Sequence, residues 1–201
     1  MARRSDHSRD ALYELSLDAA RGIIVEDGFR ALTTRNVANK IGYSVGTLYN
    51  LFSNLDDLII HLNGKTLDRL FDHLAPIERV GCPKEDVLKL LDAYILFVNE
   101  NPDLWQALFD HKLPVGQSLP DWYNVKIHKL LCLIEECLSP IFLNNNHAKQ
   151  EAASVLWAGL HGMFTLATTE KLAIVSNTPA YGMAHSFILH YLAGLEALRG
   201  E

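Results

Sequence analysis

Apolar residues recur at intervals of three and four along most of the chain, the spacing that gathers them on one face of an α-helix. No segment of the sequence shows the sustained alternation of apolar and polar residues that a half-buried strand needs. We therefore predict an all-α fold. About nine helices are expected, at 8–27, at two short stretches within 33–52, and at 54–74, 84–99, 102–112, 121–138, 146–172 and 180–199.

Helix-breaking residues separate these segments. The Ser-Pro pair at 139–140 is expected to end one helix, and the Ser-Asn-Thr-Pro stretch at 176–179 is expected to form a loop. That loop interrupts residues 172–195, a run of 24 residues without Lys, Arg, Asp or Glu that is long enough to cross a bilayer. The polar residues within the run favour two helices buried in protein instead. We therefore predict no membrane span.

Residues 33–52 have the pattern of a helix-turn-helix, in which the second helix can lie in the major groove of DNA. Thr33 and Ser44 stand where an N-cap is needed, and Gly42 stands where a left-handed backbone closes the first helix. The small residue Ala38 allows the two helices to approach closely. The side chains expected to face inward are Val37, Ile41, Leu48 and Phe52.

Four polar side chains remain on the outer face of this segment: Arg35, Thr47, Tyr49 and Asn50. Each of them can bond a phosphate or a base edge. A helical hairpin inside any bundle can carry small and apolar residues at similar positions. Here the caps, the turn, the apolar face and the polar face all agree, and the agreement favours a DNA-reading segment.

The charge distribution is compatible with a local DNA-binding region. The whole chain has a formal net charge of -6, but residues 1–50 carry seven Lys and Arg against six Asp and Glu. Residues 51–201 carry eleven against eighteen. Any contact with DNA is therefore expected near the N-terminus, where Arg3, Arg4 and Arg9 are found, and the acidic remainder is expected to lie away from it.

The sequence gives little support to catalysis or to metal binding. It lacks H-E-x-x-H, G-x-S-x-G and a phosphate-cradling glycine loop. The spacing of His185 and His190 does not place them on one helical face, and the pairs at 56–57 and 135–136 are expected on solvated helix surfaces. We expect no enzyme activity, no metal and no cofactor.

Cysteine usage and the N-terminus indicate the cellular compartment. The cysteines are Cys82, Cys132 and Cys137, an odd number without C-x-x-C spacing. Neither a disulfide framework nor a zinc site is therefore expected, which favours a reducing cytoplasm. The first ten residues contain no apolar stretch of the kind a signal peptide needs.

Residues 9–60 resemble the tetracycline-repressor-like (TetR/AcrR) transcriptional regulators. The resemblance rests on residues at that family's spacing: Gly28-Phe29, Thr33, Arg35, Val37-Ala38, Gly42, Ser44, Gly46-Thr47-Leu48-Tyr49, Phe52 and Leu58. It implies a DNA-binding domain at 1–53, a linking helix at 54–74, and a ligand-binding and dimerising domain at 75–201. A second resemblance, at Trp157 and His161-Gly162, is to a Trp…His-Gly signature in one branch of these regulators.

The resemblance also implies roles for single residues. Thr33, Arg35 and Tyr49 would contact phosphate, and Gly46, Thr47 and Asn50 would approach bases. The N-cap Ser44 is also among the expected DNA-binding residues. Val45, Leu51 and Leu55 depart from the family's usual polar, aromatic and Lys residues. Val45 could instead meet a thymine methyl group. The departures leave open an alternative, an all-α ligand-binding protein whose helix-turn-helix no longer functions.

The expected function is that of a homodimeric repressor that leaves a palindromic operator on double-stranded DNA when a small, largely apolar effector binds. The charge-poor last two helices are the expected dimer face, through Leu166, Phe187, Ile188, Tyr191, Leu192 and Leu195. Packing inside the protomer core is the alternative. Aromatic residues of the middle helices are the expected ligand pocket: Phe97, Trp105, Phe109, Trp122, Tyr123, Trp157, His161 and Phe164. Ordinary core packing is the alternative for each of them.

Overall fold

The computed structural model describes residues 7–143 and 145–199, and every regular element in these ranges is a helix. The all-α prediction is confirmed. The described chain divides into two compact units, one made of the residues up to Leu67 together with 103–123, the other made of 68–102 together with the residues from Asn124 onward. Arg3 and Arg4, expected near DNA, lie outside the described residues.

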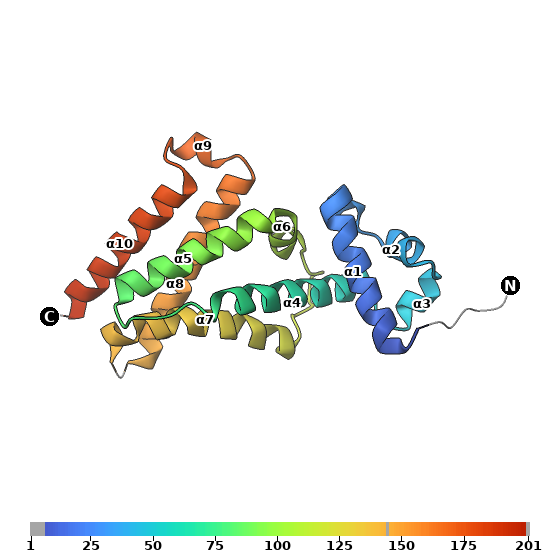
Figure 1. Ribbon diagram of the computed structural model, residues 1–201, viewed down its shortest axis with the longest axis horizontal. Coiled ribbons are helices and arrows are strands. Elements are labelled where there is room, and N and C mark those ends of the chain that lie inside the picture. Colours follow the sequence, from blue (N-terminus) through green and yellow to red (C-terminus); the bar gives the residue numbers. More distant parts are fainter. Residues whose placement is uncertain (1–6, 144, 200–201) are drawn as a thin grey trace. The chain divides into compact units, whose positions relative to one another are not determined.

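The first unit contains the predicted helix-turn-helix (Figure 1). Its elements are α1 (Arg9–Asp27), the 3-10 turn η1 (Phe29–Ala31), α2 (Thr34–Ile41), α3 (Val45–Tyr49), the N-terminal part of α4 (Leu55–Leu74) and nearly all of α6 (Pro102–Asp110). The unit is therefore larger than residues 1–53, because α6 and the segment after it are included.

The second unit holds the remaining helices: α5 (Pro83–Glu100), most of α7 (Asp121–Phe142), α8 (Asn146–Thr168), α9 (Leu172–Val175) and α10 (Ala180–Arg199). In Figure 1, α8 and α10 run in opposite directions and α9 lies at the end where they connect. The loop predicted at 176–179 is confirmed, because α9 ends at Val175 and α10 begins at Ala180. None of the described helices is both long and apolar enough to cross a bilayer.

Two predicted helix boundaries were wrong. First, α7 continues through the Ser-Pro pair to Phe142. Pro140 lies in the last turn, where a missing N–H and a ring clash disturb few bonds, and Ser139 Oγ donates a hydrogen bond of 3.0 Å to the carbonyl of Glu135. A proline this close to a helix end is tolerated.

Second, α8 ends at Thr168 instead of continuing to 172, and α9 is an additional helix. Glu170 adopts a positive φ of 57°, and the N–H of Lys171 bonds the carbonyl of Leu166 at 2.9 Å. These features form a Schellman cap, which terminates a helix even without glycine. The described chain therefore contains ten α-helices where about nine were expected.

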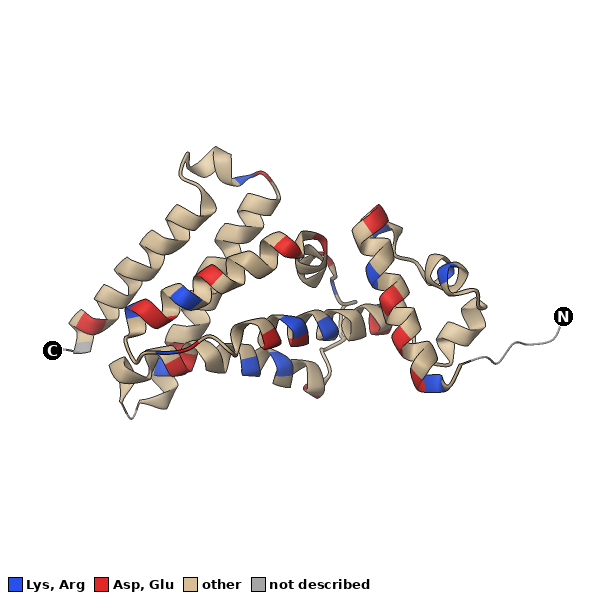
Figure 2. Ribbon diagram, viewed as in Figure 1, with Lys and Arg blue, Asp and Glu red and all other residues tan. Residues whose placement is uncertain are grey.

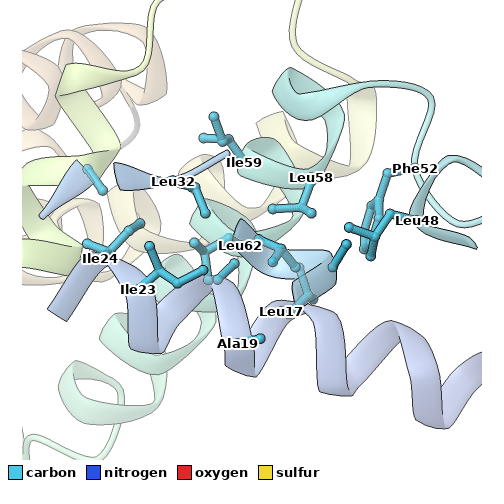
Figure 3. Packing of buried hydrophobic residues seen from close by; sticks show 14 of the residues in the cluster. Leu17, Ala19, Ile23, Ile24, Leu32, Leu48, Phe52, Leu58, Ile59 and Leu62 are labelled. Atoms are coloured by element: carbon cyan, nitrogen blue, oxygen red, sulfur yellow. The ribbon is translucent and has the colours of Figure 1, made fainter. Parts of the chain in front are cut away.

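An apolar core holds the first unit together (Figure 3). It joins α1 to both helices of the helix-turn-helix and to the start of α4, through fully covered side chains such as Ile24, Val37, Leu48 and Leu58. Ala38 is 1% exposed and Phe52 is 2% exposed, whereas Ile41 is only partly buried. The predicted inward face is thus confirmed. Burial of this face fixes which side of α3 remains open to solvent.

Candidate nucleic-acid interface

The two helices of the helix-turn-helix begin as the sequence predicts. Thr33 has extended backbone, and its Oγ1 accepts a hydrogen bond of 3.1 Å from the N–H of Asn36. Asn36 in turn donates from Nδ2 to the carbonyl of Ala31 at 2.8 Å. The start of α2 is therefore fixed by side chains on both sides of the cap, while Arg35 remains exposed beside it.

The turn between α2 and α3 is a second Schellman cap. Gly42 has φ 75° and ψ 25°, the left-handed conformation that glycine adopts without a Cβ penalty. The N–H of Tyr43 bonds the carbonyl of Ala38 at 3.0 Å, and the N–H of Gly42 bonds the carbonyl of Asn39 at 3.2 Å. This turn sets the angle at which the second helix leaves the first.

Ser44 and Thr47 form a hydroxyl pair at the start of α3. Ser44 Oγ accepts from the N–H of Thr47 at 3.2 Å, and the two hydroxyl oxygens lie 2.9 Å apart. One hydroxyl donates to the other, so the pair keeps one O–H donor and several lone pairs for an outside partner. The two residues predicted to contact DNA therefore also order each other.

The outer surface of α3 is small and open. The side chain of Tyr49 is 53% exposed, and Asn50 is exposed directly after the helix. A Cβ on Gly46 would meet only Ser44 Oγ, at 3.7 Å, which is an ordinary contact. Nothing inside the protein therefore requires glycine at this position. Val45 is half-buried and packs against the core of the unit.

Asp56 and Asp57, which are expected from the sequence on a solvated helix surface, lie in the first turn of α4 with side chains 33% and 29% exposed, and both also have partners. Asp57 Oδ2 accepts from the N–H of Ser53 at 2.8 Å, and the N–H of Asp57 donates to Asn54 Oδ1 at the same distance. Asp56 Oδ1 lies 2.9 Å from Nε2 of His111, whose side chain is 8% exposed. Asp57 is engaged because it lies in the first turn of α4, where backbone N–H groups lack partners, whereas Asp56 is engaged by the side chain of His111.

His61, one turn further along α4, joins three parts of the first unit. Its Nδ1 lies 2.9 Å from the hydroxyl of Tyr13 on α1, and its ring stacks on Trp122 with centroids 4.9 Å apart. Burial lowers the pKa of His61, and the carboxylate of Asp57 opposes this effect. No motif or spacing in the sequence predicts this cluster, because its members are far apart along the chain.

The predicted pocket aromatics do not all belong to one unit. Trp105, Phe109, Trp122 and Tyr123 are part of the first unit, whereas Phe97, Trp157, His161 and Phe164 are part of the second. The ring centroids of Trp105 and Phe109 lie 5.0 Å apart, and Trp105 is 1% exposed. In the second unit, the ring of His161 stacks on Trp157 with centroids 5.6 Å apart, and burial lowers the pKa of His161 to about 4.

The second unit contains an apolar cavity of about 40 Å³. Its walls come from the end of α4 and from α5, α7 and α8, and the polar atoms of its lining side chains belong to Tyr94 and Trp157. Trp157 is a predicted pocket residue, and sequence reasoning did not propose the aliphatic walls. The lining residues are Leu74, Val87, Leu90, Leu91, Tyr94, Leu130, Leu133, Ile134, Leu156, Trp157 and Leu160.

The predicted dimer residues divide into covered and accessible ones. Ile188 is 0% exposed and Leu192 is 3% exposed, so the chain itself already buries both side chains. Phe187, Tyr191 and Leu195 are half-buried, and Leu166 is 36% exposed. In the ribbon of Figure 2, few positions of α8 to α10 are coloured as charged residues. Additional exposed apolar side chains in these helices are Val155, Ile174, Val175, Tyr181 and Leu198.

The described residues contain no group of three or more His, Cys, Asp or Glu side chains that could hold a metal ion. The cysteines differ in exposure: Cys137 is buried, whereas Cys82 and Cys132 are exposed. Burial raises the pKa of the Cys137 thiol to about 11, which makes that thiol unreactive at neutral pH.

Two known domain families match the chain. Residues 17–62 match the family described as "Bacterial regulatory proteins, tetR family", and residues 87–186 match the "Tetracyclin repressor-like, C-terminal domain". Together the two ranges cover more than two thirds of the chain. The first range contains the helix-turn-helix, and the second contains most of the cavity wall.

Similar proteins carry related descriptions. The uncharacterized HTH-type transcriptional regulator YobS of Bacillus subtilis (strain 168) is 26% identical over 163 residues, which are 78% of this chain and 79% of YobS. A protein with unknown function from Rhodococcus sp. RHA1 has a TM-score of 0.72 at 19% identity, covering 97% of this chain and 100% of that one. A TetR-family transcriptional regulator from Streptomyces coelicolor has a TM-score of 0.63 at 20% identity, with coverages of 94% and 99%. At these identities the structural likeness concerns the fold alone.

Proposed function

Since the chain belongs to the tetR family of bacterial regulatory proteins, whose members regulate transcription through DNA binding and are not enzymes, we propose that it is a cytoplasmic homodimeric repressor released from a palindromic operator by a small, largely apolar ligand. The observation that carries the DNA-binding part is the recognition helix α3. Its N-terminus is capped by Ser44, its inner face is buried through Leu48, and its outer face is left open around Gly46.

The exposed residues of α2 and α3 have the chemistry that DNA requires. Arg35 would bind a phosphate at the start of α2, and Tyr49 would bind a second phosphate through its hydroxyl. Thr47 and Asn50 would bond base edges, Val45 would pack against a thymine methyl group, and Thr33 would contact phosphate. The absence of a Cβ at Gly46 would let the DNA approach α3 closely.

A dimer is proposed because one short recognition helix reads too few base pairs for specificity. Two-fold symmetric proteins solve this problem by presenting two helices to half-sites about 34–36 Å apart, or a multiple of that distance. The apolar, charge-poor surface of α8 and α10 supports the choice of interface. Leu166, Phe187, Tyr191 and Leu195 are its proposed contacts, since Ile188 and Leu192 are covered within the protomer.

The cavity in the second unit supports the proposal that the ligand is apolar. Its walls are almost entirely aliphatic and aromatic, as ligand pockets usually are. Its volume of about 40 Å³ holds no more than a few water molecules, so a ligand would bind only when α5, α7 or α8 moves aside. A ligand that prefers the widened form shifts the protein towards it, and a change in spacing of the two recognition helices then weakens DNA binding.

The proposal is tested by selecting bound fragments from a random DNA library with the full-length protein at near-physiological salt. We expect enrichment of an inverted repeat, and the enriched duplex then serves to screen apolar compounds for release. A folded dimer that enriches no sequence and shows no salt-dependent affinity for DNA would contradict the repressor role. It would favour the alternative of an all-α ligand-binding protein with a non-functional helix-turn-helix, to which Val45 and Leu55 point.

A further inference from the structure

Two contacts join the N-terminal part of the described chain to the residues that flank the recognition helix. Tyr13 of α1 stacks on Phe52, just beyond the C-terminal end of α3, with ring centroids 5.3 Å apart. In the turn before α3, the hydroxyl of Tyr43 lies 2.8 Å from Nδ1 of His7. Their rings also meet edge to face, with centroids 6.0 Å apart. The two contacts therefore involve the residues on either side of α3 in the chain, Tyr43 before it and Phe52 after it.

From this geometry we propose that His7 and Tyr43 form a phosphate-binding pair for the DNA backbone, in addition to the residues of α2 and α3. The inference rests on the DNA-binding part of the proposed function. Tyr43 directly precedes Ser44, the N-cap of the recognition helix. A DNA backbone that passes the start of α3 therefore also passes the imidazole ring held by Tyr43.

The pair has a hydrogen-bond donor to offer, whichever atom donates within it. A neutral imidazole has one N–H, and the tyrosine has one O–H. If Tyr43 donates to Nδ1, the proton of His7 is on Nε2, at the opposite edge of the ring. If Nδ1 donates instead, the hydroxyl of Tyr43 keeps its own proton. One of the two donors is thus used within the pair, and the other is available to an anionic oxygen.

The place is accessible to an anion. His7, Ser8 and Arg9 are all exposed, so a phosphate can reach the ring without displacing a side chain. Asp10 is directly preceded in the chain by the cationic residue Arg9, and the carboxylate of Glu14, further along α1, is paired with Lys65 at 2.8 Å. The His7–Tyr43 hydrogen bond is solvent-exposed and contributes little to folding, so its loss should not disturb the helix-turn-helix.

Phosphate ethylation interference tests the pair. The full-length protein is mixed with the ethylated duplex recovered from the library selection, and wild type is compared with His7→Ala and Tyr43→Phe. We expect one interfering phosphate per half-site in wild type that no longer interferes in His7→Ala, together with a rise in Kd of about tenfold, since a hydrogen bond to a charged group is lost in each protomer. Tyr43→Phe should weaken the interference at the same phosphate and at no other phosphate.

His147→Ala is the matched control, because His147 is an exposed histidine of the second unit. Thermal unfolding of all variants establishes that the fold is kept. Identical interference patterns and affinities for wild type and His7→Ala would overturn the inference while leaving the DNA-binding proposal intact. Failure of wild type to bind any duplex is a different result and would overturn both.

Discussion

The ring of Phe187 on α10 packs directly against the backbone of Gly159 on α8. A Cβ at position 159 would lie 2.6 Å from Cζ and 2.7 Å from Cε1 of that ring, closer than real side chains approach. Gly162, three residues further along the same helix, has no heavy atom within 4 Å of the position its Cβ would take. Gly159 therefore allows α8 and α10 to approach, whereas Gly162 does not serve this packing.

The two glycines should respond in opposite ways to substitution by alanine. We expect Gly159→Ala to lower the free energy of unfolding by about 1–3 kcal/mol, because Phe187 must leave its position in a packed interface. Gly162→Ala should raise it by about 0.5–1 kcal/mol, because alanine is the better helix former. Chemical denaturation of both variants checks the prediction. Equal effects would show that the α8–α10 packing does not depend on Gly159.

Arg35→Ala should weaken DNA binding without affecting the fold. Arg35 is exposed at the start of α2, beside the cap formed by Thr33. If each protomer loses one phosphate contact, the slope of log K against log salt falls in magnitude by about 0.9 per contact. Binding titrations of the enriched duplex at several salt concentrations measure this slope. Arg69→Ala, at an exposed position of α4 in the second unit, should leave it unchanged.

Gly46→Ala should lower the affinity for DNA without lowering the free energy of unfolding. The added methyl group meets only Ser44 Oγ inside the protein, at 3.7 Å, so the free energy of unfolding should be unchanged or slightly raised. The methyl group would project from the proposed reading surface and prevent close approach of DNA. We expect a loss of affinity of at least about tenfold, measured by fluorescence anisotropy with the enriched duplex. Unchanged affinity would mean that DNA does not approach α3 at this residue.

Asp86→Ala should destabilise the second unit. The Asp86 carboxylate is 2% exposed and accepts hydrogen bonds from the N–H groups of Val80 and Gly81, at 2.8 and 2.9 Å. Its removal leaves both donors without their partner, at a cost of about 2–4 kcal/mol. Thermal or urea denaturation measures the loss. Glu85→Ala, which removes an exposed carboxylate one position earlier, is the control and should cost less than about 0.5 kcal/mol.

Stability should fall as the pH is lowered from about 7 to about 4, in part through His161. Burial lowers the pKa of His161 to about 4 in the folded protein, below its ordinary value of 6.5. The unfolded chain therefore binds a proton in this window that the folded chain does not, and acidification favours unfolding by up to about 3 kcal/mol. Urea denaturation at several pH values should show a flatter profile for His161→Leu. His147→Ala, an exposed histidine of the same helix, should keep the wild-type profile.

The helix-turn-helix could be predicted from the sequence because its determinants are local. The caps at Thr33 and Ser44 and the left-handed turn at Gly42 involve hydrogen bonds between residues three to five positions apart. The apolar spacing then identified Val37 and Leu48 as buried. Local chemistry and the periodicity of one face were sufficient here.

The predictions of two helix ends were wrong because proline and glycine did not have their usual roles at these ends. Pro140 was expected to stop α7, but its position in the last turn makes its cost small. The end of α8 was missed because a non-glycine residue, Glu170, takes the left-handed position of the cap. Neither outcome is visible in the apolar pattern.

The sequence by itself determined the all-helical fold and the position of the reading helix, since these follow from interactions between near neighbours in the chain. Only the tertiary structure decided which apolar and aromatic residues share a surface. It assigned Trp122 to a stack on His61, buried Ile188 within the protomer, and brought His7 to Tyr43. These pairings join residues tens of positions apart, or depend on which face of a helix its neighbours cover, and helical periodicity carries no information about either.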